Sequence, residues 1–393
     1  MSARFWETPL RGTPFHERLA PLNRRQAWDG WNGFLAATVL DDVGMEHTAI
    51  RNAASLHDVS PMVKVRVTGP DARAFCDRLT VRDVSRLSVG GVQYTAWCDD
   101  DGHLIDDGTL FRLGHADYRL CCQERHLPWL HDSALGLDVG LRDETEEVAG
   151  LSLQGPCAFA VLDALGLDVA ALKPFRSVAL PLAGGEVLVS RTGFTGDLGY
   201  ELWVAPALAL PLWDRLMEAG APWGLRAIGS RALDVARVEA GFVAANVDFV
   251  PATQALREDR ARSPLEMGLG WLVAWDKGHF TGRRALLSER ERGGAWAFVG
   301  LDVAGNVPAE GAILYHKGRR EAGVVTSACW SPTVKRSVAL AQVEARFAAS
   351  RDLHAEIHAL REGRHAKLMV PARVAPRPFF AHPRRRATPP GRF

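Results

Sequence analysis

The sequence lacks the features of membrane-spanning, secreted and nucleic-acid-binding proteins. Its 393 residues contain no run of about 18 apolar residues, so no segment is predicted to cross a membrane. Residues 1–7 do not show the apolar core and cleavage site of a secretory signal. The net charge of +1 at pH 7 favours neither a nucleic acid nor an anionic membrane as a partner. We therefore expect a cytoplasmic protein.

The sequence also lacks the common signatures of metal, nucleotide and nucleophile sites. Its six cysteines form no Cys-x-x-Cys pair or other metal-ligand spacing, which indicates reduced thiols and predicts no metal site. There is no Gly-x-Gly-x-x-Gly, Walker, His-Glu-x-x-His or Gly-x-Ser-x-Gly motif. These absences argue against dinucleotide-binding, zinc-dependent and serine-nucleophile enzymes.

The composition is that of a soluble globular protein, with 47% apolar and 24% charged residues and enough length for two or three domains. The strict alternation of Val63–Val67 predicts a half-buried strand, which runs through a Gly-Pro pair into a helix over 72–79. A second strand, Leu151–Gln154, passes through another Gly-Pro pair into a helix over 157–162. The two units indicate two related α/β modules, although Gly-Pro is also simply a common helix start.

The C-terminal part of the chain has a different character. Beyond residue 290 the sequence consists of short strand-like segments, such as 297–301 and 323–327, separated by turns. This pattern predicts a small all-β module. The final stretch, 376–393, contains five prolines and three consecutive arginines from Arg384, which predicts a disordered tail.

A glycine-rich loop is the most informative local feature. Residues Arg191–Gly196 lie between strand-like segments over 186–189 and 200–204. The second segment places Glu201 among bulky apolar neighbours. In a strand such a carboxylate either faces solvent by alternation or meets a partner that supplies hydrogen-bond donors.

Two further groups of polar residues are candidates for chemistry. Asp106 and Asp107 follow an apolar pair and precede a strand, so their side chains are expected on opposite faces, and turn chemistry remains the alternative to catalysis. On a predicted helix over 229–241, Arg231, Asp234 and Arg237 follow one another at three-residue spacing and therefore share a face. A solvated, salt-bridged face is the alternative interpretation of that spacing.

The motifs of the whole chain resemble those of the aminomethyltransferase (glycine-cleavage T-protein) family of tetrahydrofolate-dependent one-carbon transferases. The resemblance covers roughly residues 40–370. The segments that carry it are, in order, Glu46–Arg51, Asp58–Met62, Leu104–Asp107, Leu153–Pro156, Arg191–Gly196, Gly199–Glu201, Arg237–Gly241, Pro264–Glu266 and Lys277–Arg283, with Thr326–Ser327 and Ser331–Thr333 near the end. Singly these motifs are weak, whereas nine in order are specific.

The resemblance implies an α+β fold. Two ferredoxin-like α/β modules and a C-terminal β-barrel would form a cloverleaf around a central folate channel. The expected boundaries are 1–288 for a folate-binding region of two interleaved α/β modules, 289–373 for the barrel, and 374–393 for the basic, proline-rich tail.

The resemblance also implies a site. Asp107 would be the catalytic carboxylate, and Glu201 would grip the pterin of tetrahydrofolate, the expected cofactor, because a carboxylate accepts two adjacent N–H groups bidentately. No metal is expected. The other residues assigned to folate binding are Met62, Tyr94, Tyr118 and Leu120, which would line the channel, and Arg231 and Arg237.

The implied activity is the transfer of a methyl or aminomethyl unit from a small donor to tetrahydrofolate, of the demethylase type. Glycine-cleavage relatives usually carry His where Pro61 stands and Arg where Leu233 stands. One alternative is nevertheless a glycine-cleavage aminomethyltransferase with a lipoyl carrier protein as partner. The other is a non-catalytic folate-binding protein of iron–sulfur cluster assembly, although His279 stands where those relatives carry Cys.

Overall fold

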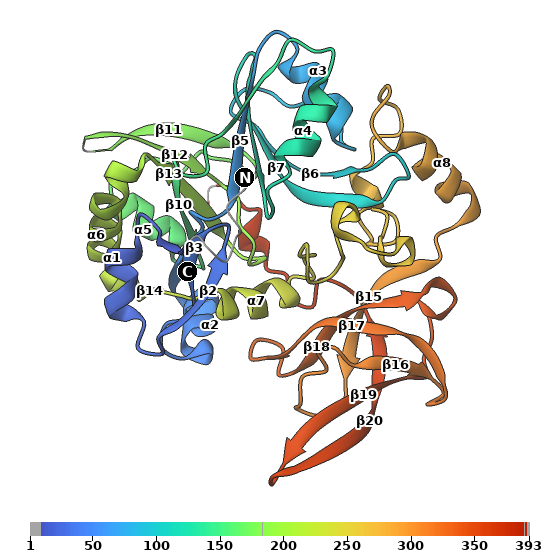
Figure 1. The fold of residues 1–393 in the computed structure, drawn as a ribbon. Coiled ribbons are helices and arrows are strands. Elements are labelled where there is room, and N and C mark those ends of the chain that lie inside the picture. Colours follow the sequence, from blue (N-terminus) through green and yellow to red (C-terminus); the bar gives the residue numbers. More distant parts are fainter. Residues whose placement is uncertain (1–8, 183, 389, 391–393) are drawn as a thin grey trace.

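The structure is a computed structural model that describes residues 9–182, 184–388 and 390. Its elements form three lobes, two of which are α/β modules and the third an all-β barrel (Figure 1). Among the described residues, no helix is long and apolar enough to cross a membrane. The sheets of the two modules and the closed barrel confirm the α+β fold with a C-terminal barrel that the family resemblance implies.

The first α/β module contains a six-stranded sheet in the order β11-β12-β13-β10-β4-β14. Its strands are β4 (Ala54–Asp58), β10 (Ala149–Gln154), β11 (Ser177–Leu182), β12 (Gly185–Ser190), β13 (Gly199–Val204) and β14 (Leu225–Ala227). Helices α5 (Ala158–Ala164) and α6 (Ala209–Gly220) pack on one face of this sheet, where Leu151, Leu202 and Leu212 belong to one buried apolar cluster. Alternate residues of the strands consequently face away from the helices.

The second α/β module contains a five-stranded antiparallel sheet in the order β6-β7-β8-β5-β9. Its strands are β5 (Val63–Thr68), β6 (Val92–Cys98), β7 (Leu104–Gly114), β8 (Asp117–Cys122) and β9 (Gly140–Asp143). Helices α3 (Ala72–Leu79) and α4 (Leu127–Ala134) cover one face of this sheet. The first predicted strand-to-helix unit is β5 with α3 and the second is β10 with α5, so both units are confirmed.

The third lobe is a closed six-stranded barrel in the order β15-β18-β17-β16-β19-β20. Its strands are β15 (Trp296–Val303), β16 (Ile313–His316), β17 (Arg320–Ser331), β18 (Arg336–Glu344), β19 (Leu353–Arg361) and β20 (Arg364–Ala375). Leu301, Leu314 and Val343 are fully buried in its core. Closure pairs β15 with β20, which leaves no unpaired sheet edge in this lobe.

The remaining elements connect the three lobes. Helix α7 (Ser230–Glu239) packs against α2 (Val43–Asn52) through Ile50 and Ala236, and lies between the first module and the barrel (Figure 1). The other elements are the small sheet β1 (Arg11–Gly12), β2 (Ala27–Trp31) and β3 (Phe34–Val39), the helices α1 (His16–Leu19) and α8 (Arg283–Arg292), and the short 3-10 helices η2 (Ala20–Leu22), η3 (Pro206–Leu208), η4 (Ala221–Trp223), η5 (Ala252–Gln254), η6 (Glu258–Arg260), η7 (Gly270–Leu272), η8 (Ala345–Phe347) and η9 (Pro383–Arg385).

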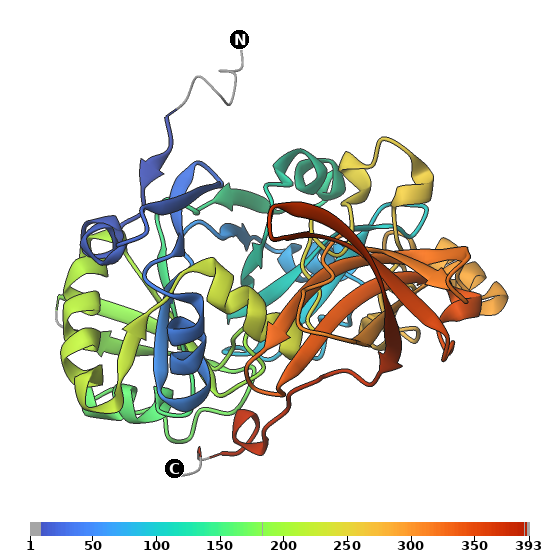
Figure 2. The same ribbon diagram turned by 90° about the horizontal axis from the view of Figure 1, so that it is seen from below.

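The C-terminal tail corrects one expectation. Composition predicts disorder over 376–393, but the described part of this segment leaves the barrel and returns to the first module (Figure 2). There the Arg384 guanidinium donates two hydrogen bonds to the Asp197 carboxylate, at 2.6 and 2.8 Å. Arginine-rich composition indicated a solvated segment, whereas a buried carboxylate 187 residues away provides a partner for one of the arginines. Residues 389 and 391–393 lie outside the described part.

The close pairing of β7 with β8 yields a stability prediction. Gly108 lies on β7 next to Asp107, and a Cβ atom added there would overlap the carbonyl oxygen of Cys121. Because backbone cannot yield as a flexible side chain does, Gly108→Ala should lower the free energy of unfolding by about 1–3 kcal/mol, measured by urea denaturation. The control is Gly278→Ala, since no atom lies within 4 Å of the added Cβ there. Equal stability of the two variants would contradict the observed strand spacing.

Candidate functional site

The two α/β sheets meet through the faces that their helices leave free. An apolar cluster joins them and contains Val59, Phe111, Cys121 and Trp203. The rings of Phe111 on β7 and Trp203 on β13 meet edge to face, with centroids 6.3 Å apart at 85°. Side chains two or four positions along the same strands point into the same inter-sheet region.

Glu201 faces this region from β13. It lies two residues before Trp203 and is 9% exposed. Its Oε2 accepts a hydrogen bond of 2.7 Å from the Thr192 hydroxyl and a longer one of 3.5 Å from the Ser190 hydroxyl. Ser190 lies on the neighbouring strand β12, directly opposite Glu201. No salt bridge to Glu201 exists among the described residues. Burial raises the pKa of its carboxyl, and the two hydroxyl bonds oppose that rise.

Asp106 faces away from the inter-sheet region. Its carboxylate is fully buried, and its Oδ2 lies 3.0 Å from Nε2 of His126 and 3.2 Å from the backbone N–H of Glu124. Its Oδ1 accepts a hydrogen bond from the backbone N–H of Asp107. The prediction that Asp106 and Asp107 lie on opposite faces is confirmed, because Asp106 contacts the helix side while Asp107 lies four positions before Phe111 on the inter-sheet side.

Asp107 is half-buried and bonded to one hydroxyl. The Tyr94 O–H on β6 donates to its Oδ2 at 2.7 Å. Burial and then the charge of Asp106 raise the pKa of Asp107 to about 7, while the Tyr94 bond opposes the rise. A carboxyl with a pKa near neutrality can both release and take up a proton at physiological pH. Asp107 therefore has the protonation behaviour of a general acid or base.

The residues expected around these carboxylates divide into two groups. Met62 packs on the inter-sheet cluster and Tyr94 bonds to Asp107, so both lie beside the site. Tyr118 and Leu120 instead belong to the core between the sheet and its helices. Tyr118 is 0% exposed with the Arg112 guanidinium over its ring, so it is not available to stack on a ligand beside Asp107. The expectation for Tyr118 and Leu120 is corrected because strand alternation turns both of them to the opposite face.

The two arginines of α7 also differ from each other. Arg237 is 2% exposed and donates hydrogen bonds to Asp234 at 2.7 Å, Asp248 at 2.5 Å and Ser327 at 2.8 Å. It thus joins α7 to the barrel, and its donors are committed within the protein, which corrects its assignment to folate binding. The ion pair between Arg237 and Asp234 agrees with the alternative interpretation of this helix, a salt-bridged face. Arg231 is exposed at the start of α7.

Two residues near the site have no counterpart in the sequence predictions. Lys64 on β5 is fully buried, and its Nζ donates to the carbonyl oxygens of Ser60 and Met62, each at 2.7 Å. Burial lowers its pKa to about 8. Trp271 is 66% exposed with its ring centroid 6.2 Å from that of Tyr94. The alternation of β5 predicts a solvent-exposed side chain for Lys64. The side chain is buried because the two sheets pack against each other, and this packing cannot be read from the sequence of one strand.

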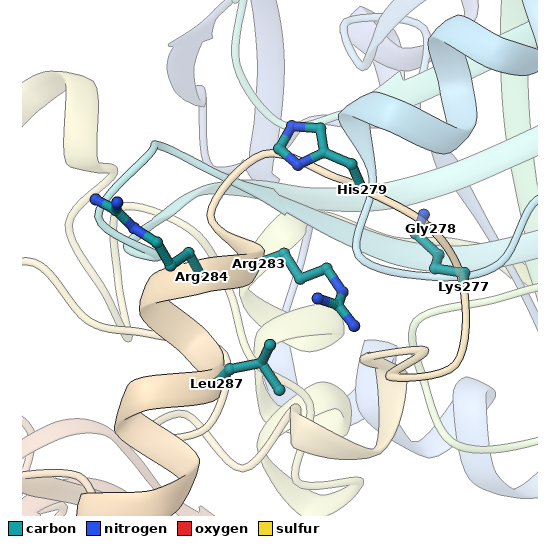
Figure 3. Close-up of a pocket in the computed structure, with 6 residues that line it drawn as sticks. All are labelled: Lys277, Gly278, His279, Arg283, Arg284 and Leu287. Carbon is teal, nitrogen blue, oxygen red and sulfur yellow. The ribbon is translucent and has the colours of Figure 1, made fainter.

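The structure also contains a surface pocket away from the two carboxylates. Its volume is about 350 Å³, and it is lined by Lys277, Gly278, His279, Arg283, Arg284 and Leu287 (Figure 3). The Lys277 ammonium donates to the carbonyl oxygens of Thr80 and Arg82, at 2.6 and 2.9 Å, so its charge is largely used within the protein. Within the described residues, no group of three or more His, Cys, Asp or Glu side chains could hold a metal ion.

Comparison with known proteins matches most of the chain. A family model described as the GCVT N-terminal domain matches residues 14–277, and one described as the glycine cleavage T-protein C-terminal barrel domain matches 297–381. The aminomethyltransferase of Halothermothrix orenii is 35% identical, with 85% of this chain and 92% of that protein covered. The aminomethyltransferase of Rubrobacter xylanophilus is 36% identical, with 95% of each covered.

Two further matches are a relative with a different name and a solved structure. The trimethylamine-oxide aldolase of Ruegeria pomeroyi is 34% identical over 94% of this chain, but the match covers only 46% of that protein. A crystal structure of the glycine cleavage system aminomethyltransferase T from Bartonella henselae has a TM-score of 0.82 at 24% identity, covering 94% of this chain and 98% of that one. It supports the fold alone.

The two family models together span both α/β modules and the barrel, and the relatives match along the same length. The chain therefore belongs to the aminomethyltransferase (glycine-cleavage T-protein) family of tetrahydrofolate-dependent transferases.

Proposed function

We propose that this protein transfers a one-carbon unit from a small methylated donor to tetrahydrofolate, at a site between the two α/β sheets. The observation that carries the proposal is the pair of carboxylates, Glu201 and Asp107, which come from different sheets, face the same region and form no salt bridge among the described residues. Carboxylates with little exposure to water and no cationic partner are costly unless a ligand supplies donors.

Glu201 has the chemistry to hold the pterin ring. A pterin presents an N–H and an amino group side by side, and one carboxylate can accept both. Thr192 and Ser190 both bond to Oε2 of Glu201, and a carboxylate has about four acceptor positions, so further positions remain for a ligand. The raised pKa of Glu201 follows from burial, and two ligand N–H donors would favour its charged form. The residues present therefore fit the group.

Asp107 and Tyr94 have the chemistry to manage a proton. When bound, tetrahydrofolate supplies a nitrogen nucleophile that takes up the one-carbon unit. Asp107, with a pKa of about 7, can accept a proton beside that nitrogen or stabilise positive charge that develops there. Tyr94 fixes the orientation of the carboxylate by donating to its Oδ2. The Trp271 ring lies beside that of Tyr94, with the two ring centroids 6.2 Å apart.

Two positions favour a small methylated donor. Pro61 stands where glycine-cleavage relatives usually carry His, and Leu233 where they usually carry Arg, so neither position offers a proton donor or a charge. The similarity to a trimethylamine-oxide aldolase over 94% of this chain supports a donor of this kind.

A second candidate is aminomethyl transfer in glycine cleavage, with a lipoyl-carrying protein as donor. It is favoured by the match to proteins named aminomethyltransferase. For one of these proteins the match covers 95% of this chain and 95% of that protein.

One experiment distinguishes methyl transfer from aminomethyl transfer: incubation with tetrahydrofolate and a panel of donors, with products identified by mass. 5-Methyl-tetrahydrofolate is expected from a methylated donor. 5,10-Methylene-tetrahydrofolate formed with ammonia would support glycine cleavage instead, and binding without any product would support the non-catalytic folate-binding role.

The pterin assignment predicts the effect of one isosteric change. Glu201→Gln keeps the size of the side chain but replaces an acceptor oxygen with a donor amide, so the affinity for tetrahydrofolate should fall about 100-fold. Isothermal titration calorimetry measures this change. Glu186→Gln, at an exposed position near the start of β12, is the matched control and should bind as the unchanged protein does. Equal affinity in the two variants would refute the assignment.

The Asp107–Tyr94 pair predicts a pH dependence. Because Asp107 acts as the carboxylate, turnover should rise with pH through about 7. Tyr94→Phe removes the bond that lowers this pKa, so the midpoint should move upward by about one pH unit. The profile of kcat against pH measures the shift, with Tyr315→Phe in the barrel as control. A midpoint that does not move, or moves downward, contradicts the proposed pair, and Asp107→Asn should abolish the rise.

A further inference from the structure

The C-terminal segment His382–Thr388, which we name the strap, lies beyond residue 381, where the match to the barrel family model ends. It leaves the barrel and returns to the first α/β module (Figure 2). Just before it, the backbone N–H of Phe380 donates to the carbonyl oxygen of Glu239, and the guanidinium carbon of Arg51 lies 4.2 Å from the centre of the Phe380 ring. The strap therefore begins at a fixed point on α2 and α7.

One charged contact ties the strap to Asp197, the residue that directly follows the glycine-rich loop. Nε and the second terminal nitrogen of Arg384 donate to the two carboxylate oxygens of Asp197 at 2.6 and 2.8 Å. The Asp197 side chain is 0% exposed and that of Arg384 is 16% exposed. A bidentate guanidinium–carboxylate pair is stronger and more directional than an exposed ion pair. Arg51 also approaches Asp197, at 3.4 Å, so the carboxylate retains one cation without Arg384.

A second contact runs in the opposite direction, from the near end of the loop to the strap. Arg191 is 3% exposed and donates to the Thr388 hydroxyl at 2.8 Å and to the carbonyl oxygen of Ala387. It also donates to the carbonyl oxygen of Leu172 at 3.0 Å. The strap thus holds the loop on both sides, through Arg191 at its start and Asp197 directly after its last residue.

Between Arg191 and Asp197 lies the residue that holds Glu201. Thr192 directly follows Arg191 and donates the 2.7 Å hydrogen bond to Oε2 of Glu201. Thr195, two residues before Asp197, donates to Oε1 of Gln154 at 2.8 Å. Because a binding group that is already held in place loses less entropy when its ligand arrives, the anchoring of this loop affects the affinity at Glu201.

We propose that Arg384 is a positioning residue for tetrahydrofolate, acting through Asp197 and the loop to hold the Thr192–Glu201 pair in its binding geometry. This inference rests on the proposed function, since it assigns folate binding to Glu201. The strap itself lies outside the segments that carry the family resemblance, and no folate contact by Arg384 itself is invoked.

The test compares two neighbouring arginines in the full chain. Arg384→Ala should weaken the affinity for tetrahydrofolate about tenfold by calorimetry, because the loop must be ordered on binding. Hydrogen exchange in a peptide covering 191–198 should become faster in this variant, without faster exchange in the barrel. Arg386→Ala is the matched control, because Arg386 is exposed in the same segment and its side chain forms no hydrogen bond to any described residue. Arg384→Lys should recover part of the affinity.

The outcomes separate this inference from the proposed function. Unchanged tetrahydrofolate affinity in Arg384→Ala, with a large loss in Glu201→Gln, would overturn the role of Arg384 and leave the pterin assignment intact. Unchanged affinity in both variants would refute the pterin assignment itself. Equal loop exchange in Arg384→Ala and Arg386→Ala would also overturn the role of Arg384, whatever the affinities. The melting temperatures of Arg384→Ala and Arg386→Ala should lie within a few degrees of that of the unchanged protein. A loss of affinity then reflects a change in the loop and not a loss of folded protein.

Discussion

The site depends on one constraint, which is that the central strands of each α/β sheet are buried on both faces. Helices cover one face of each sheet, and the remaining faces meet through Phe111 and Trp203. A polar side chain that points into this region has little access to water and must be bonded within the protein or by a ligand. Within the described part of the chain, Glu201 and Asp107 are bonded there only through hydroxyl groups, from Thr192 and Ser190 in one case and Tyr94 in the other. The proposed role of both carboxylates follows from that arrangement.

The connections between the lobes hold this region in place. Arg237 joins α7 to the barrel through Asp248 and Ser327, and its charge is used entirely within the fold. The strap then extends from the barrel to the glycine-rich loop next to Glu201. The barrel is therefore joined to α7 through Arg237, and the strap that follows it is joined to the glycine-rich loop through Arg384, although the barrel contributes neither carboxylate.

Sequence patterns predicted those features that depend on local periodicity. Alternation placed Asp106 and Asp107 on opposite faces, and the strand-to-helix units and the all-β character of the C-terminal part are present in the fold. The motifs did not indicate which face of β8 each residue occupies, so Tyr118 and Leu120 were assigned to a ligand when they belong to the helix-side core. The partners of Arg237 and Arg384 come from distant segments, and neither helical spacing nor composition could identify them.

The central claim is that the two carboxylates form one ligand site between the sheets. A crystal structure of the protein with tetrahydrofolate bound tests it most directly. We expect the pterin N–H groups to donate to the carboxylate of Glu201, and the reacting nitrogen to lie on the side of Asp107 and Tyr94. Tetrahydrofolate bound elsewhere, such as in the pocket lined by Lys277 and Arg284, with no ligand contact to Glu201, would contradict the claim.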